Sequence, residues 1–201
     1  MARATLASTP GVAGRMRSDP ALPHAPVLLR RTLLAGTVVA VGDMTHAIAT
    51  AVFALRVTTV RRVLQSPASG LLGPAAFQGG AATVALGLVV HTLVALCWTG
   101  LFLFALLRWP RLRRWTATPA ARATVGLVYG VLVWLLMDGV VLPLSRARVT
   151  SPLAPWFWIQ LVMHPLVVGL PIATLLGRPA AAHTAMDHSS SSAASGVSAT
   201  P

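Results

Sequence analysis

The stretch that decides the fold is residues 82–107, ATVALGLVVHTLVALCWTGLFLFALL, an apolar run with no Pro and no Asp, Glu, Lys or Arg. About 20 helical residues cross a hydrocarbon core about 30 Å thick, so this run predicts a membrane-spanning helix. Outward from it, three further runs meet the same criterion, at about 32–55, 123–144 and 156–176. Lipid offers the backbone no hydrogen-bond partner, so each run must be helical. The sequence therefore predicts an all-α fold, an integral membrane four-helix bundle.

The composition excludes an ordinary soluble domain. Of the 201 residues, 55% are hydrophobic and only 10% are charged, and the mean hydropathy is +0.73, whereas soluble domains carry about 25% charged residues. The net charge of +12 comes from Arg residues in short connections beside the apolar runs, where lipid headgroups are the nearest anions. We therefore expect the lipid bilayer as partner and no nucleic acid. The single Cys97 excludes a disulfide framework.

The four runs lie in a predicted membrane domain, residues 30–178, between two disordered cytoplasmic tails. Residues 1–29 are rich in Arg, Pro and Ala, and residues 179–201 are rich in Ser and Ala. A cleaved signal peptide is the alternative for the first run. That run is longer than the apolar region of a signal peptide and carries Asp43 and His46, so we expect a mature helix.

Residues 56–81 are predicted to form an outer loop. The loop begins with an apolar face and a polar face, namely Val57, Val60 and Leu64 against Arg61, Arg62 and Gln65. The Pro and Gly residues at positions 67, 70, 73, 74, 79 and 80 then predict irregular structure. We expect a surface loop packed against the bundle, and a lid or re-entrant segment is the alternative.

The distribution of Arg predicts the orientation, because cytoplasmic loops collect Arg and Lys. Eleven Arg residues lie before the first run, between the second and third, or after the fourth, and five lie on the opposite side. The sequence therefore predicts a bacterial inner-membrane protein with both termini in the cytoplasm.

Five ionisable residues inside the runs form a candidate site. They are Asp43, His46, His91, Asp138 and His164, with Gln160 and Thr50 as secondary members. Charged groups at mid-membrane cost about 2.5–3.5 kcal/mol, so they should face the bundle interior. At about 1.5 Å of rise per residue they fall at similar depths, about 9–18 Å below the outer ends of the runs. We call these residues the polar layer, and we expect Gly126 and Gly130, a GxxxG pair, to provide close helix packing near it.

Two interpretations of the polar layer stay open. In the first, the Asp and His side chains pair across helices, and the chain is an accessory or structural membrane protein. In the second, they form a functional site that binds haem b or a divalent transition metal, or that relays protons in a transporter of a small solute. The sequence contains no P-loop, no nucleophile elbow and no HExxH motif, which argues against an enzyme.

The loop and helix motifs also carry a resemblance. They are RVLQSPASGLLGPAAFQGG at 62–80, LGLVVH at 86–91, LVYGVLVWLLMDGVVLPLS at 127–145 and HPLVVGLPIA at 164–173. Together they resemble a family of small four-helix bacterial inner-membrane proteins without assigned function. The resemblance implies a four-helix membrane protein and no activity. Asp138 departs from that family's pattern, in which Asn is expected. As further partners, a second copy of the chain or a larger membrane complex stays open.

Overall fold

The computed structural model describes residues 25–148 and 151–177. Within these residues every regular element is helical, and four spans are long and apolar enough to cross a membrane. The spans are Ala25–Ala54, Gly80–Arg108, Pro119–Leu144 and Pro155–Leu176. The predicted all-α four-helix bundle is therefore confirmed, and the chain is a multi-pass membrane protein. The C-terminal tail and most of the N-terminal tail lie outside the described residues.

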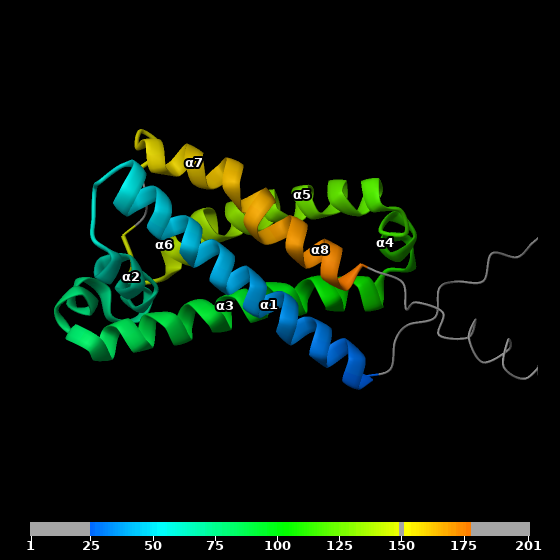
Figure 1. Ribbon diagram of the computed structural model, residues 1–201, viewed down its shortest axis with the longest axis horizontal. Helices are drawn as coiled ribbons and strands as arrows, with labels where there is room; N and C mark the ends of the chain where they lie inside the picture. The colour runs from blue at the N-terminus through cyan, green and yellow to red at the C-terminus, as the bar shows by residue number, and fades with distance from the viewer. Residues whose placement is uncertain (1–24, 149–150, 178–201) are drawn as a thin grey trace, which may run out of the picture.

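The spans are built from α-helices joined to shorter turns of other helical types. In chain order the elements are α1 (Ala25–Ile48), the π-helical turn η1 (Ala49–Ala54), α2 (Val60–Leu72), the 3-10 helix η2 (Gly73–Gln78), α3 (Gly80–Arg108), α4 (Pro110–Trp115), α5 (Pro119–Leu136), the π-helical turn η3 (Met137–Val141), α6 (Leu142–Leu144), α7 (Pro155–His164), the π-helical turn η4 (Pro165–Gly169) and α8 (Leu170–Leu176). Figure 1 shows the spans side by side, with α2 at one end and α4 at the other. We call these the α2 end and the α4 end.

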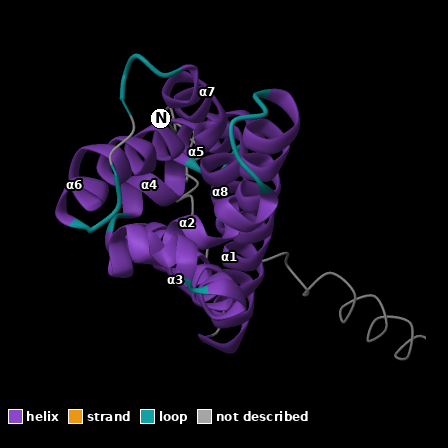
Figure 2. Cartoon of the chain, turned by 90° about the vertical axis from the view of Figure 1, so that its left-hand side faces the viewer, coloured by secondary structure: helices purple, strands orange, loops and turns teal. Residues whose placement is uncertain are grey.

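Helix α1 holds the bundle together. It packs against α3 on one side and against η4 and α8 on the other, and α5 packs against α7, η4 and α8. Figure 2, which looks onto the α2 end, shows α1 between α3 and α8. Nearer the α4 end, the hydroxyl of Tyr129 donates to the carbonyl oxygen of Trp98 at 2.6 Å and joins α5 to α3. The buried apolar core consists of Ala35, Val39, Ala40, Ala95, Phe102, Leu106, Val133, Val168, Ile172, Ala173 and Leu176.

Glycines allow the closest helix contacts. A Cβ atom at Gly130 would lie 2.5 Å from the Cα of Pro165, and one at Gly126 would lie 2.9 Å from the carbonyl oxygen of Gly169. The two glycines of the GxxxG pair thus lie against η4. Away from these contacts the helices expose large apolar side chains, including Val41, Leu93, Phe104, Val128 and Val162. Such a surface suits lipid, where packing rather than water exclusion holds helices together.

The first span begins earlier than predicted. Residues 25–29 were assigned to the disordered tail, but α1 starts at Ala25, so that prediction was wrong. Pro26 suits the first turn of a helix because its missing N–H has no partner there. Arg30 and Arg31 consequently lie within the helix, where a long Arg side chain extends from the backbone towards lipid headgroups.

The outer loop was also predicted wrongly, because 60–78 is helical. Pro67 lies inside α2, and the helix ends at Gly73, whose φ of +61° favours glycine. Long-range packing outweighs the local breakers. A Cβ atom at Gly87 of α3 would collide with the carbonyl oxygen of Leu64, so the backbones of α2 and α3 touch there.

The polar face predicted for this segment was wrong for Gln65. This side chain is fully buried, and its Nε2 donates to Thr83 Oγ1 at 2.9 Å and to the carbonyl oxygen of Gly80 at 3.1 Å. Val57, from the predicted apolar face, is instead 71% exposed. Helix α2 is thus fixed on α3 through small and polar residues rather than through an apolar stripe.

The three π-helical turns occur at the polar residues. Thr50 lies in η1, Asp138 lies in η3, and η4 begins directly after His164. Pro165 and Pro171 lie at the start of η4 and just after it, where their missing N–H groups leave backbone carbonyls free. π-helical turns are rare and concentrate at functional sites. The backbone conformation therefore also indicates a candidate functional site at these polar residues.

Candidate functional site

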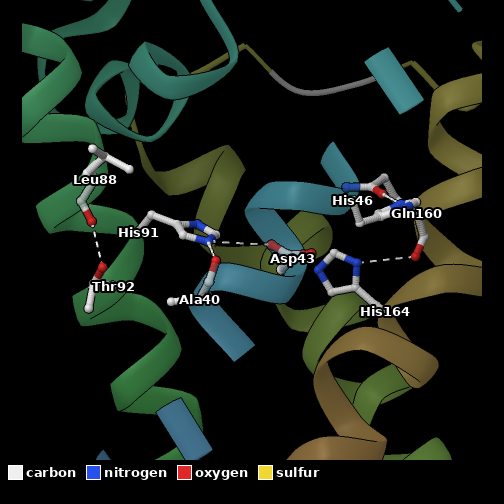
Figure 3. A network of polar contacts seen from close by, with 8 residues as sticks. All are labelled: Ala40, Asp43, His46, Leu88, His91, Thr92, Gln160 and His164. Carbon is white, nitrogen blue, oxygen red and sulfur yellow. Dashed lines mark hydrogen bonds and ion pairs between the residues drawn. The ribbon is translucent and has the colours of Figure 1, made fainter. Parts of the chain in front are cut away.

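Asp43 of α1 is the centre of the polar layer. Figure 3 shows its carboxylate between the imidazoles of His91 on α3 and His164 on α7. Asp43 Oδ2 lies 3.8 Å from His91 Nε2, and His164 is within electrostatic range of Asp43. The carboxylate side chain is 16% exposed, and its Oδ1 atom is buried without a hydrogen-bond partner among the described residues. Asp43 thus has one oxygen near an imidazole and one uncommitted oxygen.

The histidines next to Asp43 are oriented by backbone carbonyls. His91 Nε2 lies 3.0 Å from the carbonyl oxygen of Ala40, and His164 Nδ1 lies 3.2 Å from that of Gln160. A carbonyl only accepts, so each of these nitrogens carries a proton. The Nε2–H group of His91 therefore faces the carbonyl oxygen of Ala40 and the carboxylate of Asp43. These two contacts hold α3 against α1.

His46 and Gln160 connect α1 to α7 on the other side of Asp43. His46 Nε2 lies 2.8 Å from Gln160 Oε1, and His46 Nδ1 lies 3.4 Å from the hydroxyl of Thr50. The indole of Trp156 stacks on the imidazole, with ring centroids 6.5 Å apart and planes 9° from parallel. Both ring nitrogens of His46 are therefore engaged, and its orientation is set from three directions.

Asp138 stands apart from the other four ionisable members. It lines a small cavity of about 150 Å³ together with His164 and Gln160. It is within electrostatic range of His164, which is itself within electrostatic range of Asp43. The structure thus brings Asp43, His46, His91, His164, Gln160 and Thr50 together, and it places Asp138 near His164.

A larger cavity opens at the α2 end and reaches the polar layer. Its volume is about 990 Å³, at the upper end of the range of about 300–1,000 Å³ that is common for small-molecule sites. Asp43, His91 and Gln160 line it, as do Arg62 of α2 and both Arg146 and Arg148 after α6. We call this the α2-end cavity. Because α2 and η2 form one of its walls, the segment predicted as a loop is part of the site.

The metal and haem alternatives find no matching geometry. In 25–148 and 151–177, no three His, Cys, Asp or Glu side chains gather in a way that could hold a metal ion. Of the three imidazoles in the layer, only His91 lines the α2-end cavity, and its Nε2 is already directed at Ala40. Within these described residues the side chains do not form a metal centre, and none of the imidazoles of the polar layer offers haem an uncommitted Nε2 in the α2-end cavity.

No protein-family model, curated protein or solved structure matches this chain.

Sequence reasoning missed the residues at the outer part of the α2-end cavity. Arg146 and Arg148 belong to the five Arg residues on the predicted outer side, and the sequence predicts no site role for them or for Trp156. The sequence does contain a signal for these residues. Two Arg residues, two positions apart, follow Ser145 directly after a span. The backbone N–H of Arg146 donates to the carbonyl oxygen of Gly70 at 3.0 Å and so joins this segment to α2, a contact that no local pattern encodes.

Proposed function

We propose that this chain is a proton-linked transporter of a small solute, with the α2-end cavity as binding site and Asp43 as the group that carries the proton. Transport of this kind needs a solvent-reachable cavity inside the membrane and a buried group that changes its protonation state. The α2-end cavity and Asp43 supply the two parts, and the neighbouring imidazoles offer further proton acceptors.

The observation that carries the proposal is the unpartnered Oδ1 atom of Asp43. A carboxylate that served only to join helices would pair both oxygens, because an unpaired buried polar atom costs about 1–3 kcal/mol. Oδ1 is buried without a partner in the described residues, and Asp43 lines the cavity. Protonation of the carboxyl would lessen this cost, because it removes the buried negative charge. The purely accessory or structural role leaves this atom unexplained.

The same proposal includes the location and the orientation. The bacterial inner membrane and cytoplasmic termini are supported by the excess of Arg on the α4 side, so the α2-end cavity would face outward. Membership in the family of small bacterial inner-membrane proteins that the motifs resemble belongs to the proposal as well. That family has no assigned function, so it adds no activity.

The test is a flux assay with the full chain reconstituted into liposomes that contain a pH-sensitive dye. A panel of anionic, neutral and cationic small solutes is added outside at acidic pH. At least one solute is expected to speed proton entry above the rate in protein-free liposomes, because solute and proton move together. Proton entry that no solute in the panel alters would contradict the proposal and return the chain to a structural role.

A further inference from the structure

The outer part of the α2-end cavity is strongly cationic. Arg62, Arg146 and Arg148 line it and are exposed, whereas Asp43 is the single acidic residue in the lining. The guanidinium of Arg62 lies 4.9 Å above the centroid of the Phe77 ring, a cation–π contact that orients it without neutralising its charge. Three guanidinium groups and one carboxylate leave this cavity with an excess of positive charge.

Apolar side chains continue the cavity wall from this cationic mouth inwards. Val90 and Val94 of α3 and Val141 of η3 line it, and Met137 lies near the polar layer. A ligand that fits has a negative head at the guanidinium groups and an apolar body against these side chains. Guanidinium groups recognise phosphate and carboxylate by paired N–H donors, which makes oxyanions the matching chemistry.

We propose that the α2-end cavity binds an amphipathic oxyanion, with a phosphate or carboxylate head held by Arg62, Arg146 and Arg148. This inference rests on the proposed function, since it names the solute class of the same cavity. The head comes either from a membrane lipid or from a water-soluble anion. Both sources present the same oxyanion to the same three side chains.

Binding of an anion in this cavity also explains how solute binding is coupled to proton binding. The apolar body of the anion, which extends from the head towards the polar layer, displaces water beside Asp43 and so favours the protonated carboxyl over the ionised one, and anion and proton bind together. By reciprocity, protonation of Asp43 tightens anion binding. The other groups around Asp43 are His46, His91 and His164, with Asp138 near His164 and the three Arg residues at the mouth. Protonation of a histidine would also favour an anion, so the test separates the histidines from Asp43.

The experiment is calorimetric titration of the full chain in nanodiscs of zwitterionic lipid, at acidic and at neutral pH. The probes are inorganic phosphate and a short-chain phosphatidate, with short-chain phosphatidylcholine as the uncharged-head control. Phosphatidate is expected to bind more tightly at acidic pH. Arg62→Ala and Arg146→Ala are expected to weaken it about tenfold each, because charge-assisted hydrogen bonds are lost. The matched control is Arg61→Ala, since Arg61 neighbours Arg62 but does not line the cavity.

The binding results distinguish the two sources of the anion and test the role of Asp43. Binding of phosphatidate alone identifies a lipid-like amphiphile, and binding of both anions identifies a free oxyanion as sufficient. No binding of either anion, or equal affinity in the Arg62→Ala and Arg61→Ala variants, overturns the anion site. Asp43→Asn is expected to lose the tighter binding of phosphatidate at acidic pH, and tighter acidic binding that persists in full in that variant overturns the link to Asp43.

The two proposals fail separately. Proton entry driven only by a neutral or cationic solute, without anion binding, removes the anion assignment and leaves the proton-linked function standing. Anion binding that moves no protons removes the proton-linked function and leaves the anion assignment standing.

Discussion

Replacing Gly169 by Ala is expected to lower the melting temperature of the detergent-purified protein by roughly 10 °C. A Cβ atom at Gly169 would collide with the carbonyl oxygen of Gly126 and would lie 2.5 Å from the backbone nitrogen of Gly130. Both obstacles are backbone atoms of α5, so no side chain can turn aside and η4 must move away from α5. Overpacking of this kind costs about 3 kcal/mol or more where the backbone has to shift. Thermal unfolding followed by circular dichroism measures the change.

Two other glycines of the spans provide the matched controls. A Cβ atom at Gly100 or Gly139 would meet nothing within 4 Å, so Gly100→Ala and Gly139→Ala should melt within a few degrees of the wild type. A Gly169→Ala variant that melts together with these controls would show that α5 and η4 are not packed as described.

Asp43→Asn is expected to reduce solute-dependent proton entry into liposomes to the background of protein-free vesicles. Asn keeps the size of the side chain but neither binds nor releases a proton in the accessible pH range. The cavity wall would keep its shape, so the melting temperature should stay close to that of the wild type. The flux assay with the pH-sensitive dye measures the loss, and thermal unfolding shows that the bundle is intact.

Asp138→Asn is the control for this experiment. Asp138 is also a carboxylate in a span, but it lines the small cavity near His164 and does not line the α2-end cavity. Its replacement should leave a large part of the solute-linked proton entry. Equal and complete loss in both variants would assign the proton-carrying role to the whole layer instead of Asp43, and unchanged flux in Asp43→Asn would contradict the role altogether.

The spans and the neighbourhood of Asp43 could be predicted because they follow from local and one-dimensional properties. Apolar length alone identifies residues 82–107 and the three other runs. The cost of charge in lipid turns Asp43, His91 and His164 inward, and the rise of a helix gives their common depth. In the structure these three side chains lie together.

Other parts depend on contacts between distant residues and could not be read from the sequence. Helix α2 continues through Pro67 because it packs closely against α3. There the missing side chain of Gly87 leaves room for the carbonyl of Leu64, which lies more than twenty positions earlier in the chain. The estimated depth of a residue in the membrane also does not tell which direction its side chain faces around the bundle axis. Asp138 was expected at a depth similar to that of the other members, but it lines a second, smaller cavity together with His164. The α2-end cavity itself exists only because of how the spans are placed relative to one another.

The central claim is that Asp43, although inside the membrane, is reached by water from the α2-end cavity. The most direct measurement is modification of an Asp43→Cys variant, in a Cys97→Ala background, by a charged membrane-impermeant thiol reagent added to the α2 side. Val41→Cys is the matched control, because Val41 lies two residues away on α1 and is 61% exposed on the lipid-facing surface. The thiol at position 43 is expected to react and the thiol at position 41 is not, since a charged reagent needs an aqueous path. No reaction at position 43 from the α2 side, or equal reaction at both positions, would contradict the central claim.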